Sequence, residues 1–355
     1  MTLEELGYSI ELENYRKDKN LDSFGIGRVV SEHKERYIVK TSENEYEGEV
    51  IGNLRFSASS RADFPAVGDW VAISEYDDGK VLIYAVFPRK TVIQRQAVGK
   101  QGESQIIATN VDYAFIVQAV DRDFNVNRIE RYLTICNTSN VEPIIILNKI
   151  DLIDNLELAK LITLIQGRIK DVPVMAISNE SKNGIEELKH SLEKGKTYCL
   201  LGSSGVGKST LLNNLLGEQH MKTGAISTST SKGKHVTSYR ELLVLESGGM
   251  IVDNPGMREI GIADSADGLN TTFGAIVELS QQCKFKNCTH TSEVGCAVLA
   301  AVESGKIDRL SYENYLKMER EKEHFEATVA ERRKKDKAFG KMLKNYKKDK
   351  NFKKE

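Results

Sequence analysis

The order of three short motifs constrains this chain more than any other feature of its sequence. The tetrapeptide NKID at 148–151 comes first, the glycine-rich loop GSSGVGKS at 202–209 second, and the tetrapeptide DNPG at 253–256 third. Apolar runs at 143–147 and 198–201 precede the first two motifs and predict buried strands of a parallel sheet. Nucleotide sites of open α/β sheets lie at the carboxyl ends of such strands, so the fold must bring the first two motifs together at one edge.

The glycine-rich loop has the spacing of a phosphate-binding loop. Its backbone N–H groups can wrap phosphate oxygens, Lys208 can reach the β and γ groups, and the Ser209 hydroxyl can bind Mg²⁺. A helix predicted over 208–216 directs its positive end toward the same anion. The alternative is a turn without a ligand. The residues expected to bind nucleotide here are Gly202, Ser203, Ser204, Gly205, Val206, Gly207, Lys208, Ser209 and Thr210.

The NKID tetrapeptide has the form of a guanine-recognition motif, which uses Asn148, Lys149 and Asp151. The Asp151 carboxylate can accept two hydrogen bonds from the N1–H and N2 amino groups of guanine, and adenine lacks these donors. With adenine bound, the carboxylate would be left without hydrogen-bond partners, and this loss disfavours the binding of adenine strongly. A short strand predicted at 174–177 ends at Ser178, which is placed to support the base, although a serine there is also an ordinary turn residue. A solvated loop is the alternative for the tetrapeptide.

Residues after the phosphate-binding loop are expected to bind the metal and the γ-phosphate. Strands predicted at 241–245 and 250–252 form a hairpin that delivers Asp253 to hold Mg²⁺ through water, while the Gly256 N–H senses the γ-phosphate. The polar segment 222–238 is expected to be a switch loop in which Thr237 binds Mg²⁺. A connection without a role is the alternative.

The residue that orients the attacking water is not a glutamine in this chain. Many nucleotide hydrolases place a Gln directly after the metal loop, but Met257 occupies that position and has no suitable donor or acceptor. His235 in the expected switch loop is the catalytic candidate, together with Lys208, because imidazole can hydrogen-bond water near neutral pH. An exposed histidine without a catalytic role is the alternative.

Three cysteines and one histidine form a second cluster within fourteen residues, in the pattern C-x4-C-x-H-x5-C. Three thiolates and one imidazole make a closed tetrahedral Zn²⁺ site, which folds a small domain and leaves no position for a substrate. Disulfide pairing is the alternative, and an intracellular compartment argues against it. The expected ligands are Cys283, Cys288, His290 and Cys296, whereas Cys136 and Cys199 are expected to be buried apolar residues.

Length and composition predict several soluble domains. The chain has 355 residues, and short alternating segments between 26 and 87 suit a five-stranded OB barrel or a sandwich, in which Trp70 is expected in the core. No apolar run has the length of a membrane span and the N-terminus lacks a secretion signal, so a cytoplasmic protein is expected.

The C-terminal segment 331–355 is strongly basic, with 12 Lys or Arg against 4 Asp or Glu. This tail could bind phosphate backbones or be a solvated helix. A helix capped by Ser311 is expected to extend through Arg333, into the start of the tail.

The motif order, the flanking sequences GKHVTS and DNPGMREIGI, and the cysteine cluster resemble the bacterial small-ribosomal-subunit-dependent GTPases, the circularly permuted RsgA or YjeQ family. The resemblance extends from about residue 25 to the tail. The family commonly has GRHTT and DTPG where this chain has Val236 and Asn254. The resemblance implies an OB barrel that contacts RNA, a permuted α/β GTPase domain and a mostly α zinc domain. We assign them to residues 1–100, 101–265 and 266–355.

The resemblance also implies a function. It predicts a monomer that binds the 30S subunit and its 16S rRNA and hydrolyses GTP to GDP and phosphate in late subunit maturation, stimulated by the subunit. It makes His235 catalytic, with Mg²⁺ accompanying GTP and one structural Zn²⁺. The alternatives are a nucleotide-gated RNA-binding protein acting on another ribosomal particle, an RNA-binding module that does not hydrolyse nucleotide, and a P-loop ATPase or kinase, which NKID disfavours.

Overall fold

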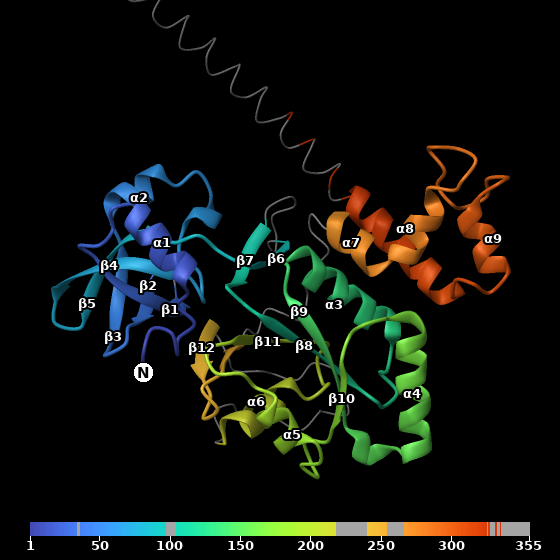
Figure 1. Ribbon diagram of the computed structural model, residues 1–355, viewed down its shortest axis with the longest axis horizontal. Coiled ribbons are helices and arrows are strands. Elements are labelled where there is room, and N and C mark those ends of the chain that lie inside the picture. Colours follow the sequence, from blue (N-terminus) through green and yellow to red (C-terminus); the bar gives the residue numbers. More distant parts are fainter. Residues whose placement is uncertain are drawn as a thin grey trace, which may run out of the picture.

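The protein is described by a computed structural model that covers residues 1–33, 36–96, 104–217, 240–253 and 266–324, and the single positions 326, 331 and 334. Figure 1 shows three bodies in a row: a β-barrel in blue, an α/β body in green and yellow, and a group of helices in orange. This arrangement confirms the predicted fold class. The domain boundaries predicted at 100 and 265 lie outside the described residues and stay predictions.

The N-terminal body is a closed five-stranded barrel. Its strands follow the order β1-β2-β3-β5-β4, and β4 pairs again with β1, which closes the sheet. Alternate residues fill the interior, among them Val29, Val39 and Ile83. The helix α1 (Ile10–Asp18) precedes the barrel, and α2 (Gly52–Ser57) and η1 (Arg61–Asp63) lie between β3 and β4. The strands are β1 (Gly25–His33), β2 (Arg36–Lys40), β3 (Glu45–Val50), β4 (Trp70–Asp77) and β5 (Lys80–Val86).

The central body is a six-stranded sheet in the order β10-β9-β8-β11-β13-β12, parallel except for the β12–β13 pair. Apolar residues of α3 (Val126–Thr138) and α4 (Asn155–Arg168) belong to the core on one face, and those of α5 (Ile185–His190) and α6 (Lys208–Leu216) to the core on the other. The strands are β8 (Tyr113–Ala119), β9 (Glu142–Asn148), β10 (Val174–Ile177), β11 (Thr197–Leu201), β12 (Arg240–Val244) and β13 (Met250–Asp253), and η2 (Ile150–Leu152) follows β9.

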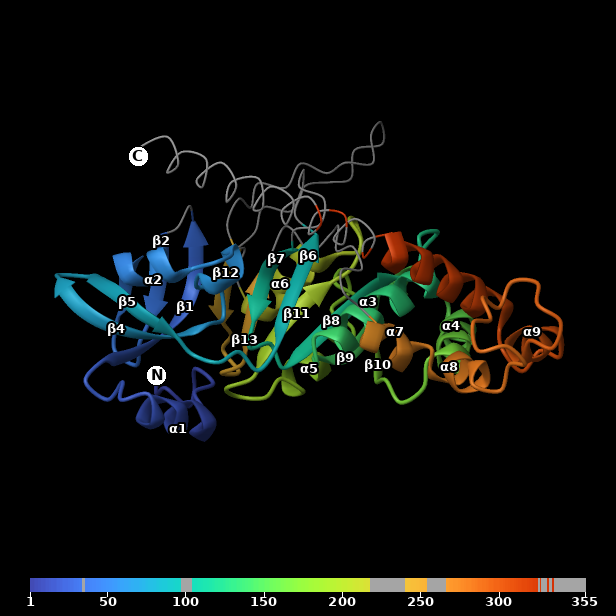
Figure 2. The same cartoon turned by 90° about the horizontal axis from the view of Figure 1, so that it is seen from above.

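The barrel and the central sheet are joined into one sheet of eleven strands. The strand β12 pairs antiparallel with β1 through Ser31 opposite Glu241 and Glu32 opposite Arg240. A separate hairpin of β6 (Val92–Gln96) and β7 (Ser104–Thr109) connects the two bodies in the chain. Figure 2 shows β12 and β13 between the barrel and the remaining strands of the central sheet.

The buried side chain of Arg28 strengthens the same junction. Its guanidinium donates to the carbonyl oxygens of Leu6 (2.6 Å), Gly68 (3.2 Å) and Asn110 (3.1 Å). It also donates to the Thr197 hydroxyl at the start of β11 (2.9 Å). Burial lowers the pKa of Arg28 to about 10, so the side chain stays charged at neutral pH. One arginine therefore connects the N-terminal segment, the barrel and the central sheet.

The C-terminal body is helical and packs on α3. It consists of α7 (Ala266–Thr272), α8 (Gly274–Ser280), α9 (Ala297–Glu303) and a helix over 309–324, around a core that includes Leu269, Phe273 and Met318. The prediction that Ser311 caps the last helix is wrong. The helix begins at 309, and the Asp308 carboxylate accepts from the Ser311 N–H (2.9 Å), because an acidic side chain there can reach the unpaired amides of the first turn. Among the described helices, none has the length and apolar character needed to cross a membrane.

Candidate nucleotide site and metal centre

The phosphate-binding loop connects β11 to α6, as the sequence predicts. Gly205 and Gly207 have φ values of 84° and 97°, in the left-handed region that favours glycine, so the loop can turn its amides toward one side. The Lys208 Nζ donates to the carbonyls of Gly202 and Ser203, each at 2.6 Å, and is thereby held across the loop. Ser204 and Gly205 are exposed, Val206 is buried, and Ser209 and Thr210 lie in the first turn of α6.

Asn148 of the NKID motif contacts the phosphate-binding loop directly. It ends β9, its side chain is buried, and its Nδ2 donates to the Val206 carbonyl at 2.7 Å. The approach is close because residue 207 is a glycine: a Cβ there would lie 2.3 Å from the Asn148 Nδ2. Two motifs separated by more than fifty residues therefore share one site.

Ser178 and Asp151 also meet at this site. Ser178 directly follows β10 and is fully buried, and its hydroxyl donates to the Asp151 carboxylate. The Asp151 side chain is otherwise exposed beside this edge of the sheet. A hydrogen bond from a serine fixes the orientation of the carboxylate, which a base-reading residue needs before the ligand arrives.

Two further residues at the site were not predicted from the sequence. Asn179 donates to the Gly207 carbonyl (2.9 Å), and its backbone N–H donates to the Asn148 side chain (3.2 Å). Asp121, just after β8, pairs with the Lys149 Nζ at 2.7 Å. Although burial opposes it, hydrogen bonding to Lys149 lowers the pKa of Asp121. Asn179 comes just after β10, and Asp121 comes just after the apolar strand β8. A polar residue at the carboxyl end of a strand in a parallel sheet is a candidate site residue, and this signal could have identified both.

The predicted metal and water-orienting residues are only partly described. Asp253 ends β13 at the same edge of the sheet as the phosphate-binding loop, since β11 and β13 are parallel neighbours. His235, Thr237 and Gly256 lie outside the described residues. Their expected roles stay predictions.

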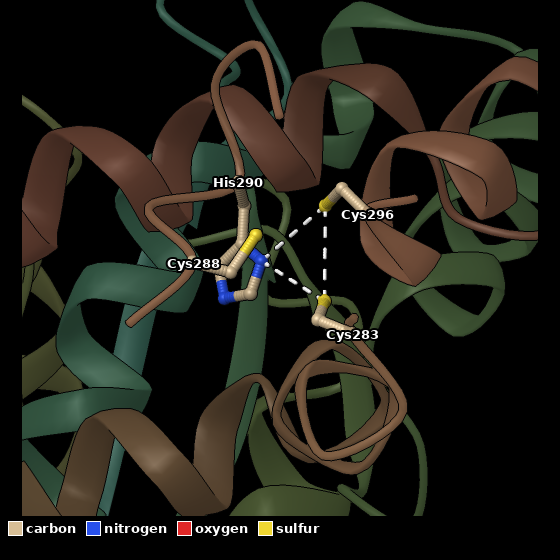
Figure 3. A group of neighbouring side chains, drawn as sticks. All are labelled: Cys283, Cys288, His290 and Cys296. Atoms are coloured by element: carbon tan, nitrogen blue, oxygen red, sulfur yellow. Dashed lines mark hydrogen bonds between the residues drawn. The ribbon is translucent and has the colours of Figure 1, made fainter. Parts of the chain in front are cut away.

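Cys283, Cys288, His290 and Cys296 form the second site. Figure 3 shows their side chains converging from the loop between α8 and α9. The Sγ atoms of Cys283 and Cys296 are 3.8 Å apart, and these atoms lie 3.6 and 3.5 Å from the His290 Nδ1. All four ligand atoms lie within 4.8 Å of one another.

These separations fit a tetrahedral zinc site. Zn–S bonds of about 2.3 Å and Zn–N bonds of about 2.0 Å place tetrahedral ligand atoms roughly 3.8 Å (S to S) and 3.5 Å (S to N) apart. A disulfide needs about 2.05 Å between its sulfur atoms, so the cysteines are not paired with one another. The cluster can therefore bind a metal ion with no ligand position left open.

Neighbouring residues hold the cysteine loop in shape. The Tyr312 hydroxyl donates to the His290 carbonyl at 2.6 Å, which ties the loop to the last helix. The Glu293 carboxylate accepts from the Thr289 hydroxyl (2.6 Å) and from the N–H groups of Thr289 (2.7 Å) and Thr291 (2.9 Å). These hydrogen bonds hold the pKa of Glu293 well below its usual range. The remaining two cysteines, Cys136 and Cys199, are buried as predicted.

Comparisons with known proteins show the family of the chain. The RsgA GTPase family model matches residues 86–263. The "Small ribosomal subunit biogenesis GTPase RsgA 2" of Lactiplantibacillus plantarum is 44% identical over 296 residues, 83% of each chain. The chain belongs to the RsgA GTPase family. As a member of the RsgA family, it is an enzyme that hydrolyses GTP.

Other RsgA relatives cover more of the chain. The "Small ribosomal subunit biogenesis GTPase RsgA 1" of Bacteroides thetaiotaomicron is 37% identical over 345 residues, 97% of this chain and 96% of the relative. The crystal structure of YjeQ from Thermotoga maritima matches with a TM-score of 0.62 and 29% identity, over 83% of this chain and 96% of that one. YloQ, described as a circularly permuted GTPase, matches in fold with a TM-score of 0.59 and 23% identity, over 87% and 96%.

Proposed function

We propose that this GTPase binds the 30S ribosomal subunit through its 16S rRNA and hydrolyses GTP in late subunit maturation, and that the subunit stimulates hydrolysis. Its relatives are named for small ribosomal subunit biogenesis, which supports the choice of particle. The protein acts as a cytoplasmic monomer. The basic segment 331–355 and the barrel supply the RNA contacts, with an affinity that falls as salt rises.

The hydrogen bond between the Asn148 side chain and the Val206 carbonyl gives the strongest support for GTP as the nucleotide in this proposal. It joins the guanine-recognition motif to the phosphate-binding loop, so one ligand can occupy both. Asp151 can bind guanine at one end of the site, and the loop can bind the phosphates at the other, so the site suits GTP. In a P-loop ATPase or kinase the Asp151 carboxylate would have no partner, because adenine lacks the two donors that guanine offers.

Each site residue then has a role in the hydrolysis. Lys208 exchanges the Gly202 and Ser203 carbonyls for the β- and γ-phosphate oxygens, and Ser209, Thr237 and Asp253 hold the Mg²⁺ that accompanies GTP. His235 orients the water that attacks the γ-phosphorus, and the bond to the β–γ bridging oxygen breaks to leave GDP and phosphate. The amides of Gly256 and of the phosphate-binding loop bind the phosphate oxygens.

The cysteine cluster holds one structural Zn²⁺. The metal supplies folding free energy to the C-terminal body, since a closed site of three thiolates and one imidazole has no coordination position for a reactant. Cys283, Cys288, His290 and Cys296 are its ligands, and their separations fit this metal.

Turnover with purified 30S, 50S and 70S particles tests the choice of particle. We expect stimulation by 30S subunits and little by the others. We expect Lys208→Ala to abolish turnover, and His235→Ala to lower it while GTP binding is retained. Equal stimulation by 50S subunits would favour a protein that acts on another ribosomal particle. No turnover with any particle, despite GTP binding, would favour an RNA-binding module that uses nucleotide as a structural ligand.

An Asp151→Asn variant tests the guanine assignment. We expect it to lose the preference for GTP over ATP, because an amide cannot accept both hydrogen bonds from guanine. Asp154→Asn is the matched control, since Asp154 is three residues away and caps α4 by accepting from the Glu157 N–H. An Asp151→Asn protein that keeps its preference would exclude this role for the carboxylate.

A further inference from the structure

Two asparagines hold the phosphate-binding loop from outside. Asn179 comes just after β10 and is 8% exposed, and its Nδ2 donates to the Gly207 carbonyl at 2.9 Å. Asn148, at the end of β9, donates in the same way to the Val206 carbonyl at 2.7 Å. The strands β9 and β10 are parallel neighbours. Two successive carbonyls of the loop are therefore held by side chains from the ends of two adjacent strands.

These two carbonyls determine where the loop amides point. In a planar trans peptide, the C=O group and the N–H group that follows it point in opposite directions. The bond to the Val206 carbonyl therefore fixes the direction of the Gly207 N–H, and the bond to the Gly207 carbonyl fixes that of the Lys208 N–H. Gly207 is the N-cap of α6, and N–H groups at the start of a helix point outward, where they can bind an anion.

Asn179 is itself held by α6. The Asn214 Nδ2 donates to the Asn179 side-chain oxygen at 3.0 Å and to its backbone carbonyl at 3.3 Å. Because the side-chain oxygen faces this donor, the nitrogen of the same amide is the atom that faces the Gly207 carbonyl. The Asn179 backbone N–H donates to the Asn148 side-chain oxygen at 3.2 Å and so orients that amide as well. Asn179 thus connects the guanine-recognition motif, the phosphate-binding loop and α6.

We propose that Asn179 is a positioning residue of the nucleotide site, which directs the Lys208 N–H toward the β-phosphate. It acts through the Gly207 peptide, so its side chain need not touch the nucleotide. Asn214 supports this role from α6, because it holds the amide of Asn179 in the required orientation. The inference rests on the proposed function only in taking the loop 202–209 as the phosphate site.

Binding of GDP and GMP to the full-length, zinc-loaded protein tests this role. Both nucleotides have the base and the α-phosphate, but only GDP has the β-phosphate that such a loop also binds. We expect Asn179→Ala to raise the Kd for GDP about tenfold, near the upper end for one neutral hydrogen bond, and to change the Kd for GMP little. Asn214→Ala should raise the Kd for GDP about threefold, and this effect should disappear in an Asn179→Ala background, because Asn214 acts through Asn179.

Asn314→Ala is the matched control. Asn314 is also 8% exposed, and its amide donates to the Glu130 carboxylate (2.7 Å) and to the Asn127 carbonyl (3.2 Å) where the last helix packs on α3. The control therefore removes an equally buried asparagine with two hydrogen bonds. We expect it to lower the melting temperature at least as much as Asn179→Ala does, with no change in the Kd for GDP.

An unchanged Kd for GDP in Asn179→Ala would overturn the positioning role. An equal rise for GDP and GMP, or a similar rise in Asn314→Ala, would also overturn it, because lost stability alone would then explain the weaker binding. If Asn179→Ala does not fold, the half-buried Asn214→Ala decides by the same comparison of GDP with GMP.

These measurements need no ribosomal particle, so the positioning role can fail while the proposed 30S function holds. By contrast, an unaltered protein that binds neither GDP nor GTP would refute the proposed function itself.

Discussion

Replacing Arg28 with methionine should loosen the junction between the barrel and the central sheet. Methionine fills much of the same volume but offers no donor to the acceptors around it. The carbonyls of Leu6 and Asn110 lose the donor that Arg28 supplies, whereas the Gly68 carbonyl keeps a bond from the Asn110 amide at 3.0 Å. Leu6 itself is fully buried, so water cannot readily take the place of the guanidinium.

The expected cost follows from these contacts. Each buried acceptor left unpaired costs on the order of 1–3 kcal/mol. Burial of the charged guanidinium itself costs free energy, and this cost lowers the pKa of Arg28 to about 10. Methionine carries no charge, so its variant avoids this cost and recovers part of the loss. We therefore expect a net loss of about 3 kcal/mol at the junction, which corresponds to about a 100-fold increase in local opening.

Hydrogen–deuterium exchange of the amides in β1, β11 and β12 measures this opening, because the whole protein has several bodies and need not unfold in one step. Arg16→Met is the matched control. Arg16 also donates to backbone carbonyls, those of Asp22 (3.0 Å) and Phe24 (2.9 Å), but its side chain is 22% exposed and water can replace it. Unchanged protection at the junction in Arg28→Met, or an equal loss in Arg16→Met, would refute the reasoning.

Two further predictions concern the metal and the packing on α3. Thiol titration of the native protein should find no reactive cysteine with zinc bound and three after chelation, while Cys136 and Cys199 react only on unfolding, because burial raises the pKa of both thiols. Three reactive thiols in the zinc-loaded protein would exclude the assigned ligands. Gly268→Ala should lower the melting temperature, since its Cβ would lie 2.1 Å from the Thr138 Oγ1, whereas Gly167→Ala in α4, with no atom within 4 Å of its Cβ, should raise it. A change of melting temperature in the same direction for both variants would contradict the close packing of Gly268 against α3.

Local patterns predicted the elements of the nucleotide site well. The strand at 174–177 and the helix at 208–216 have the predicted bounds, because apolar runs and a glycine-rich turn define both ends of such segments. The cysteine cluster was also predictable, since its ligands lie within fourteen residues and their spacing reflects one metal.

Contacts between distant segments could not be predicted in the same way. The pairing of β12 with β1 depends on a register between strands about two hundred residues apart, which hydrophobic periodicity does not specify. Arg28 lies in a strand where a charged side chain normally indicates an exposed face, and its burial depends on carbonyls from three separate segments. The prediction that Ser311 caps the last helix was wrong for a similar reason. The Ser311 hydroxyl donates to Glu130, which is distant in the sequence, and local patterns do not show this contact.

The pairing of β12 with β1 also determines which strand edge of the central sheet is covered. A sheet that ended at β12 would present a row of unsatisfied amides and carbonyls, a template for strand addition by another molecule. The barrel covers this row at Ser31 and Glu32. The barrel therefore leaves β10 as the outer strand at the central-sheet end of the joined sheet, and it covers part of the β12 edge that strand addition would need.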